Sequence, residues 1–330
     1  MKRIYCNDVT EKNIDQTIQV NGWVATRRDH GGIIFLDLRD HTGLVQLVFN
    51  PDNKSIFTLA ESIRSEDVIE ILGMVKNRME GTVNAELDTG KIEIIVEKLN
   101  ILNKSETPPF KINDAGVNED QRLEYRYLDI RSQQMQKNLR FRSNLIANIR
   151  GFFYSKDFID VETPILTKTT PEGARDYLVP SRVNTNHFFA LPQSPQLFKQ
   201  TLMIGGLDKY FQIAKCFRDE DLRSDRQPEF TQLDVEMSFV DESDVIALAE
   251  KLFRHLFENL TVFKDQNIKF EKISYSDSMS IFGCDRPDYR NPLRLKEIKD
   301  IVKNVEFKVF SEPANKQDSR VVALKEPNGC

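Results

Sequence analysis

The sequence predicts an α+β protein in which a small barrel of β-strands precedes a larger mixed sheet with flanking helices. Three observations support this prediction. Short runs of alternating apolar residues recur between residues 17 and 103, a stretch rich in Pro, Asn and charge interrupts them, and longer helical and strand-like periodicities follow. At 330 residues the chain is long enough for about two domains.

Five alternating runs make up the predicted barrel in residues 1–103, at 17–27, 33–40, 45–50, 68–78 and 91–102. Turn-forming HGG, HTG and DTG triplets separate several of them. Between the third and fourth runs lies NKSIFTLAESIR, whose apolar residues fall on one helical face. This is the element order of an OB-fold barrel, whose exposed face often binds single-stranded nucleic acid. A generic small barrel is the alternative.

Residues 104–118 form a predicted linker, because they are poor in periodic apolar residues. Residues 119–287 then predict the second domain. QKNLRFRSNLIANIRGFFYSKDF has helical spacing, and FIDVETPIL, HFFALP, KYFQIAKCFR and EFTQLDVEMSF are strand-like. A further helix is expected over SDVIALAEKLFRHLFENL. The pattern favours a mixed sheet with flanking helices.

Composition indicates an ordinary globular protein of the reducing cytosol. The net charge of −5 argues against a general nucleic-acid coat but permits a local basic patch. Cys6, Cys216, Cys284 and Cys330 lie far apart without a nearby His cluster, so neither a zinc site nor a disulfide framework is predicted. No run of about 18 apolar residues occurs, which makes secretion and membrane spanning unlikely on sequence grounds and favours a cytoplasmic location.

One stretch, FRDEDLRSDRQPEFTQLDVEMSF, joins a charged first half to a strand-like second half. A plain amphipathic strand needs no such charges beside it, so they indicate a polyanion held on a rigid sheet. Arg218 has a planar fork that binds phosphate through two hydrogen bonds. The alternative is a solvated charged hairpin.

FIDVETPIL, the FRDEDL stretch just quoted, and TPEGARDYLVPSR with LPQSPQLFKQ are the segments by which the chain resembles a known family. They are similar to motif 1, motif 2 and the aspartate-pocket signature of class II aminoacyl-tRNA synthetases of the bacterial aspartyl type. The resemblance implies an OB-fold anticodon-binding domain followed by a class II sheet. It also implies an aspartate–tRNA ligase that uses ATP and Mg²⁺ and acts on tRNA(Asp).

The resemblance implies roles for individual residues. Arg218 and Glu220 are the expected catalytic residues, with Arg218 touching the α-phosphate and the substrate carboxylate. ATP is expected to contact Arg218, Asp219, Glu220, Gln227 and Phe230, the last by stacking on adenine. The residues expected around aspartate are Glu172, Ser194, Gln196, Lys199, Arg218, Gln232 and Asp234.

Lys199 is the residue expected to select aspartate by charge. A buried lysine pairs with the side-chain carboxylate of aspartate, whereas asparagine would leave it without a counter-charge, at a cost on the order of a few kcal/mol. Asp234 is expected to orient this lysine. Glu172 lies on a loop punctuated by Pro and Gly, as expected of a lid. The plainer interpretation of Lys199 is an exposed helix lysine.

On the barrel, the resemblance implies anticodon contacts at six residues. An aromatic platform ringed by hydrogen-bond donors is the means by which unstacked RNA bases are bound. Each position taken separately is equally compatible with core or surface. The residues are Arg28, His30, Phe35, Gln46, Arg64 and Arg78. His30, in RRDHGGIIF, resembles the version in bacteria whose synthetase charges both aspartate and asparagine tRNAs.

Motif 1 implies a homodimer, since its apolar residues pack along a subunit interface in the related enzymes. A strand ending at a turn before Pro164 explains the same residues. The family's motif 3, the acidic magnesium ligands and a late pocket arginine are not found, and residues 288–330 resemble the start of the bacterial insertion domain. We therefore expect a fragment of a longer chain, with an incomplete sheet, that neither activates aspartate nor folds its catalytic half stably alone.

Two rival interpretations remain open. A synthetase-like RNA-binding protein without catalysis would keep the barrel, but it gains nothing from retaining the charged residues of the motif 2 stretch. A synthetase for lysine or asparagine shares barrel and core, but TPEGARDY and QSPQLFKQ favour aspartate.

Overall fold

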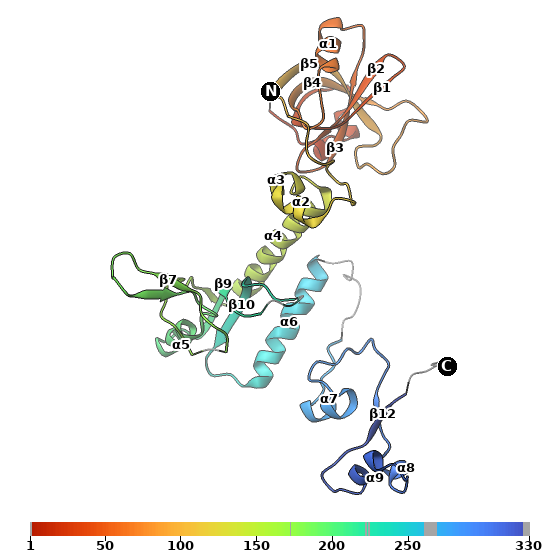
Figure 1. Cartoon of the computed structure of the whole chain (residues 1–330). Coiled ribbons are helices and arrows are strands. Elements are labelled where there is room, and N and C mark those ends of the chain that lie inside the picture. The colour runs from red at the N-terminus through yellow and green to blue at the C-terminus, as the bar shows by residue number, and fades with distance from the viewer. Residues whose placement is uncertain (1, 172, 222, 224, 261–268, 326–330) are drawn as a thin grey trace. The chain divides into compact units, whose positions relative to one another are not determined.

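The structure is a computed structural model that describes residues 2–171, 173–221, 223, 225–260 and 269–325. The chain divides into two compact units (Figure 1). The first comprises Met1–Leu202 with Lys209–Glu236, and the second comprises Met203–Asp208 with Met237–Cys330. The predicted domain boundaries near residues 118 and 288 are not tested by this division and stay predictions.

A closed five-stranded barrel opens the first unit, with the strand order β1-β2-β3-β5-β4. Helix α1 (Lys54–Glu61) lies between β3 and β4, so the predicted OB-fold element order is confirmed. The strands are β1 (Thr17–His30), β2 (Ile33–Arg39), β3 (Leu44–Phe49), β4 (Val68–Asn77) and β5 (Ile92–Asn103).

Alternation along the strands builds the barrel core. Every second residue of β1 from Ile18 to Val24 is buried, and the same pattern recurs in β2 and β4. Gly73 stands where β4 meets β5 and the strand register shifts. A Cβ atom there would lie 2.5 Å from the Ile95 carbonyl oxygen, so the position requires glycine.

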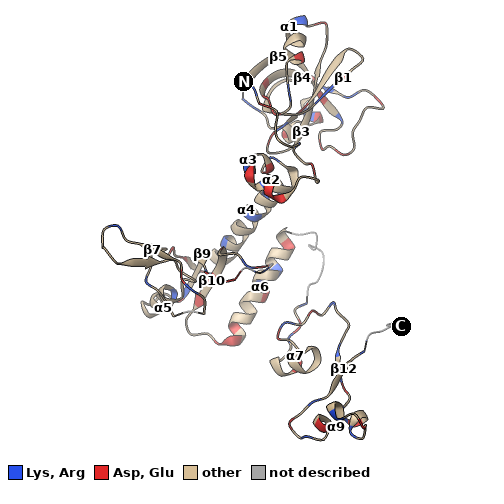
Figure 2. Cartoon of the chain, in the orientation of Figure 1, with Lys and Arg blue, Asp and Glu red and all other residues tan. Residues whose placement is uncertain are grey.

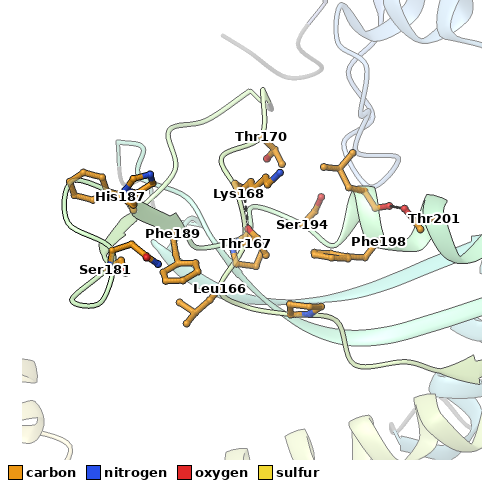
Figure 3. Close-up of a pocket in the computed structure, with 15 residues that line it drawn as sticks. Leu166, Thr167, Lys168, Thr170, Ser181, His187, Phe189, Ser194, Phe198 and Thr201 are labelled. Carbon is orange, nitrogen blue, oxygen red and sulfur yellow. Dashed lines mark hydrogen bonds between the residues drawn. The ribbon is translucent and has the colours of Figure 1, made fainter.

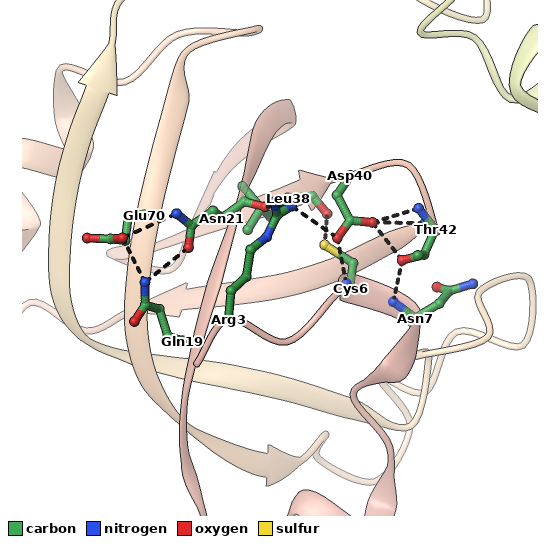
Figure 4. A network of polar contacts seen from close by, with 10 residues as sticks. Arg3, Cys6, Asn7, Gln19, Asn21, Leu38, Asp40, Thr42 and Glu70 are labelled. Carbon is green, nitrogen blue, oxygen red and sulfur yellow. Dashed lines mark hydrogen bonds and ion pairs between the residues drawn. The ribbon is translucent and has the colours of Figure 1, made fainter. Parts of the chain in front are cut away.

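The segment before β1 is fixed to the barrel through the Asp40 carboxylate (Figure 4). Asp40 accepts hydrogen bonds from the Cys6 amide at 2.8 Å and from the Thr42 hydroxyl at 2.6 Å. The Cys6 thiol is fully buried and donates to the Leu38 carbonyl at 3.6 Å. Burial and the neighbouring Asp40 charge raise the pKa of this thiol.

Three helices follow the linker, namely α2 (Glu119–Glu124), α3 (Arg126–Asp129) and α4 (Gln133–Tyr154). Side-chain oxygens of Asn118 and Ser132 cap α2 and α4, as these residue types favour. Helix α4 contains Lys and Arg but no Asp or Glu, whereas α2 and α3 carry acidic side chains (Figure 2).

A three-stranded sheet of order β10-β9-β6 forms the centre of the remaining part of the first unit. Strand β9 (Lys209–Phe217) lies in the middle of this sheet. Strand β6 (Ile159–Asp160) runs parallel to it on one side, and β10 (Glu229–Met237) lies on its other side. The strand predicted over residues 158–166 is therefore wrong beyond Asp160. Thr163 bonds through its side chain to Gln212, and Pro164 has no N–H for a ladder. The hairpin of β7 (Leu178–Pro180) and β8 (Phe188–Ala190) and helix α5 (Gln196–Ile204) complete this part.

Aromatic rings pack α4 against the sheet. The rings of Phe153 and Phe211 stack with centroids 4.8 Å apart, and Phe158 meets Phe153 edge to face. Nearer the middle of the same helix, the Arg142 guanidinium donates to the Thr231 hydroxyl of β10 at 2.9 Å. The middle of α4 is thus held to β10 and its C-terminal end to β9.

The second unit contains one long helix and several short elements. Val302, Ala314 and Val321 form a small core within it. None of the described helices is both long and apolar enough to cross a membrane. Its elements are α6 (Glu242–Leu260), α7 (Tyr275–Phe282), β11 (Leu295–Glu297), α8 (Lys299–Val302), α9 (Lys308–Ala314) and β12 (Val322–Leu324).

We predict that Gly73→Ala lowers the free energy of unfolding by about 1–3 kcal/mol, because the added methyl group is forced against the Ile95 carbonyl. Denaturant unfolding followed by fluorescence measures this, since Trp23 of β1 is the one tryptophan in the sequence. Gly151→Ala is the control, because its Cβ meets nothing within 4 Å in helix α4. A Gly73→Ala protein as stable as the Gly151→Ala protein would contradict the prediction.

Candidate functional site

The candidate site lies on one face of the β9-β10 pair. Along β10, Phe230, Gln232, Asp234 and Glu236 are two residues apart, so their side chains leave the strand on the same side. This is the strand-like half of the charged stretch identified in the sequence. A rigid sheet therefore presents one aromatic, one amide and two carboxylates in a row.

Lys199 of helix α5 extends onto this face. Its side chain is 12% exposed, and Nζ lies 2.9 Å from Asp234 Oδ1 and 3.2 Å from Glu236 Oε2. Burial alone lowers the pKa of this ammonium, but hydrogen bonds and charge from Asp234 and Glu236 outweigh burial and raise it. The lysine is thus half-enclosed, charged and oriented by two carboxylates.

The two carboxylate oxygens of Asp234 have different surroundings. Oδ1 accepts from Lys199, while the buried Oδ2 meets no described donor in good hydrogen-bond geometry, although the Tyr210 hydroxyl lies close enough to lower the pKa of Asp234. Burial raises the pKa of Asp234, and the nearby ammonium of Lys199 opposes that rise. A buried acceptor without a donor is costly unless a ligand supplies one, so Oδ2 is suited to a ligand ammonium or amide.

Buried side chains of β9 support the carboxylates from behind. The Tyr210 hydroxyl donates to Gln212 Oε1 at 2.8 Å, and the Thr163 hydroxyl donates to the same oxygen at 2.9 Å. Burial, followed by the charge of Asp234, raises the pKa of Tyr210. The Cys216 thiol reaches Gln232 Oε1 at 3.2 Å, which orients the amide of Gln232.

Arg218 follows the end of β9, where its amide donates to the Pro228 carbonyl at 2.9 Å. Its guanidinium lies 5.0 Å from the ring centroid of Phe230. Phe230 and Asp234 are four residues apart on β10, a span of about 13 Å at about 3.3 Å per residue. The two expected cations, Arg218 and Lys199, therefore contact the same face of one strand at separate points.

The other expected ATP contacts lie in the hairpin that joins β9 to β10. Glu220 pairs with Arg226 at 3.1 Å, and the amide of Asp219 donates to the Arg175 carbonyl at 3.0 Å. Gln227 lies just before β10. Glu172 lies outside the described residues.

An apolar cavity of about 620 Å³ lies beside α5 (Figure 3). Lys168, Ser194 and Phe198 line it toward the helix, and Leu166 and Phe189 line it toward the β7-β8 hairpin. Among the described residues expected to contact aspartate, Ser194 alone lines this cavity, and Lys199 and Arg218 do not. Gln196 begins α5 beside it.

Two residues of this region were not predicted from the sequence. Glu236 is the second carboxylate on Lys199, and it could have been found from its period-two spacing with Asp234. Gln193 is 2% exposed and bonds to the Ala174 backbone and, at 2.5 Å, to Asp176. Gln193 thus holds the loop around Ala174 and Asp176 next to the start of helix α5.

A second polar cluster lies on the barrel. Arg28 bonds to Asp37 at 2.7 Å and to Gln46 at 3.4 Å, and Gln46 donates to Glu93 at 3.0 Å. Arg78 is buried, and its Nη2 has no hydrogen-bond partner within the described part of the chain. Burial raises the pKa of Asp37 and of Glu93 and lowers that of Arg78.

The structure brings together four of the six predicted barrel residues. Phe35 pairs directly with Arg28 across β1 and β2, beside the cluster formed by Gln46 and Arg78. Arg64 is exposed, and its described contact is made by the backbone amide, to Asp67. His30 is exposed at the end of β1. Asp37 and Glu93 complete the cluster, although sequence reasoning, which sought donors, missed these acceptors.

Comparison with known proteins gives two family matches. The family described as tRNA synthetases class II (D, K and N) matches residues 118–322, and the OB-fold nucleic acid binding domain matches residues 18–102. An aspartate–tRNA(Asp/Asn) ligase from Legionella pneumophila (strain Corby) is 54% identical over 100% of this chain and 56% of its own length. The corresponding ligase of strain Paris is 53% identical with the same coverage. The chain thus spans about half the length of the curated relatives it matches.

Solved structures agree. Asparaginyl-tRNA synthetase from Pyrococcus horikoshii complexed with asparaginyl-adenylate has a TM-score of 0.74 and 26% identity, covering 84% of this chain and 66% of its own. A putative aspartyl-tRNA synthetase from Leishmania major Friedlin has a TM-score of 0.70 and 26% identity, covering 81% of this chain and 55% of its own.

We predict that Lys199→Met destabilises the protein more at pH 8 than at pH 5. Without the ammonium, Asp234 faces Glu236, and burial and like charge hold its pKa higher still. Between the ordinary and the raised pKa the native state binds more protons than the unfolded state, so stability falls as pH rises. The loss at pH 8 is expected to be about 3 kcal/mol.

Urea unfolding followed by circular dichroism at both pH values measures this loss. Lys215→Met is the matched control, because Lys215 forms an exposed pair with Glu229 at 3.0 Å on the neighbouring stretch of β9. Its loss is expected to stay below about 1 kcal/mol at either pH. Equal destabilisation by Lys199→Met at pH 5 and pH 8 would show that the two carboxylates do not depend on the ammonium.

Proposed function

The chain belongs to the class II tRNA synthetases (D, K and N), and from that premise we propose that the native protein activates L-aspartate with ATP and transfers the aspartyl group to tRNA(Asp). The observation that carries the proposal is the half-enclosed ammonium of Lys199, which two carboxylates orient on the same sheet face that Arg218 and Phe230 share. The activity is that of an aspartate–tRNA ligase.

Activation requires the aspartate α-carboxylate to attack the α-phosphorus of ATP, so that an aspartyl-adenylate forms and pyrophosphate leaves. Negative charge gathers on the phosphate oxygens during this step, and a fixed cation stabilises it. Arg218 is our proposed cation, because its backbone is held at the end of β9. Glu220, paired with Arg226 in the adjoining hairpin, is proposed to act beside it.

The ATP base is proposed to stack on Phe230. In the structure the Arg218 guanidinium lies over that ring, so adenine binding requires the arginine to move toward the phosphates. Asp219 and Gln227 are the further proposed ATP contacts. No group of three or more His, Cys, Asp or Glu side chains that could hold a metal ion occurs within the described ranges, so we derive no step through Mg²⁺.

Aspartate is proposed to lie with its side-chain carboxylate on Lys199. The carboxylate of Asp234, which Lys199 and the Tyr210 hydroxyl approach, is then proposed to accept a hydrogen bond from the substrate ammonium as well. The further contacts that we propose around the substrate are Ser194, Gln196, Gln232 and Glu172, together with Arg218. Asparagine presents a neutral amide to the same lysine and is excluded by the loss of charge pairing.

The barrel face is proposed to bind the anticodon. Phe35 offers a ring for base stacking, and Arg28, Gln46 and Arg78 offer donors to base edges. The unpartnered Nη2 of Arg78 has a free hydrogen-bond donor for this purpose. His30 and Arg64 remain proposed contacts at the rim, where the RNA must reach them.

Two further statements belong to the proposal. We propose a homodimer through motif 1, because α4 and β6 expose large apolar side chains, among them Phe141 at 48% and Ile159 at 49% exposure. Sedimentation of the native protein as a monomer would contradict it.

We propose that the protein is located in the cytoplasm, where its proposed tRNA substrates are found.

We predict that the native protein catalyses aspartate-dependent exchange of pyrophosphate with ATP, and that asparagine supports exchange at least about a thousandfold less well, because its neutral amide does not form a charge pair with the Lys199 ammonium. Arg218→Met is expected to lower the exchange rate by about 10²–10³-fold. Lys215→Met removes an exposed cation of β9, three residues before Arg218. It serves as the control and should leave the rate unchanged. Absence of exchange in the unaltered native protein would instead favour an RNA-binding protein without catalysis.

The Legionella relatives are named aspartate–tRNA(Asp/Asn) ligases. We therefore predict that the native protein also charges tRNA(Asn) with aspartate, at a rate that we expect to lie within about tenfold of that for tRNA(Asp). Charging assays on the two transcripts with labelled aspartate measure the ratio. A tRNA of unrelated anticodon should accept none. A preference for tRNA(Asp) of a hundredfold or more would restrict the proposed substrate to that tRNA.

A further inference from the structure

A buried carboxylate at the edge of the barrel is shared by two arginines. The Glu66 side chain is 2% exposed, and its Oε2 lies 2.6 Å from Nη2 of Arg39 and 2.7 Å from Nη1 of Arg131. Arg39 belongs to β2, whereas Arg131 lies between α3 and α4. One oxygen therefore joins the barrel to the segment that leads into the second part of the first unit.

The backbone around Glu66 is itself firmly held. Its φ is +69°, a left-handed conformation that costs a non-glycine residue about 1–3 kcal/mol and persists only where surrounding contacts impose it. Those contacts are backbone hydrogen bonds to β1, from the Glu66 amide to the Val24 carbonyl at 2.7 Å and from the Val24 amide to the Asp67 carbonyl at 2.9 Å. The carboxylate is thus fixed in place by the barrel.

The neighbouring residue holds the start of the same segment. Asp67 Oδ1 accepts from the Ser105 amide at 2.7 Å, directly after β5 ends. We call residues 105–131, which join the barrel to helix α4, the crossing segment. Residues 66 and 67 therefore bind the crossing segment at both of its ends, at Ser105 and at Arg131. A segment with both ends anchored to adjacent residues loses most of its freedom to swing.

Arg131 passes this constraint on to helix α4. Its guanidinium also lies 5.3 Å from the ring of Trp23, so a salt bridge and a cation–π contact fix it together. Helix α4 begins two residues later at Gln133, whose amide donates to the Asn113 side chain at 2.7 Å. The start of α4 is consequently held from two directions.

The middle and the C-terminal end of α4 contact the sheet that carries the candidate site. Arg142 bonds to the hydroxyl of Thr231, which stands between Phe230 and Gln232 on β10. Phe153 stacks on Phe211 of β9. A continuous series of rigid contacts thus runs from Glu66 through Arg131 and α4 to the strand that carries the site.

We propose that Glu66 and Arg131 are positioning residues for tRNA charging, which fix the barrel relative to the β9-β10 site so that one tRNA engages both. This inference rests on the proposed function. Two binding surfaces linked rigidly at the correct separation bind one ligand far better than two that are free to move. Amino-acid activation involves only small molecules at one site and does not depend on this link.

Glu66→Gln and Arg131→Met in the full native protein test the proposal. Glutamine keeps the length of the side chain but removes the charge that two guanidinium groups share, and methionine removes the arm while leaving the Arg39–Glu66 pair intact. For both, the kcat/KM of tRNA charging is expected to fall by about tenfold or more, mostly through the KM for tRNA, while pyrophosphate exchange stays within about twofold of the unaltered protein. The double variant should be no worse than the poorer single variant, since both break one link.

Glu70→Gln is the matched control. Glu70 is a carboxylate of the same barrel that accepts hydrogen bonds from Gln19 and Asn21, and it does not contact the crossing segment (Figure 4). It should leave both activities unchanged. Thermal unfolding of each variant identifies any that simply fails to fold. Equal loss of exchange and charging in Arg131→Met, or unchanged charging in both variants, overturns the positioning role. A native protein without aspartate-dependent exchange overturns the proposed function instead.

Discussion

One buried ammonium between two carboxylates gives the candidate site its character. Lys199 comes from a helix, and Asp234 and Glu236 come from one strand, so the contact also fixes α5 against the sheet. Taking three charged groups out of water is costly, and hydrogen bonds at 2.9 and 3.2 Å offset part of that cost. The arrangement contains charges of both signs, so the ammonium can pair with a ligand carboxylate and the carboxylates can pair with a ligand ammonium.

The rest of the first unit keeps that contact in register. Thr163 and Tyr210 fix the Gln212 amide behind the site, and the stacked rings of Phe153 and Phe211 hold α4 to the same sheet. A polar site built on strands and supported by buried partners is held more accurately than one built on loops. In the described part of the hairpin around Glu220, the contacts include an ion pair with Arg226 and a backbone hydrogen bond from Asp219 to Arg175.

Much of this architecture could be predicted from the sequence, because its periodicities are strong. Alternation at period two and one intervening helix predicted the barrel, and the row along β10 followed from the same rule. The length of β6 could not be predicted, since residues 158–166 look like a strand until Thr163 turns its hydroxyl to Gln212. Glu66 and Gln193 were missed for a related reason. Their roles depend on partners distant in the chain, and local patterns carry no information about such pairs. Glu236, in contrast, could have been found from its period-two spacing with Asp234.

The sealed thiol near the N-terminus has a chemical consequence. Cys6 contributes both its amide and its sulfur to the barrel wall, and its raised pKa keeps the sulfur protonated near neutral pH. An alkylating reagent therefore attacks this sulfur only when the first turn of the chain detaches, whereas Cys284 stands open to reagent throughout. The rate at which Cys6 is alkylated therefore measures how often the N-terminal segment detaches from the barrel.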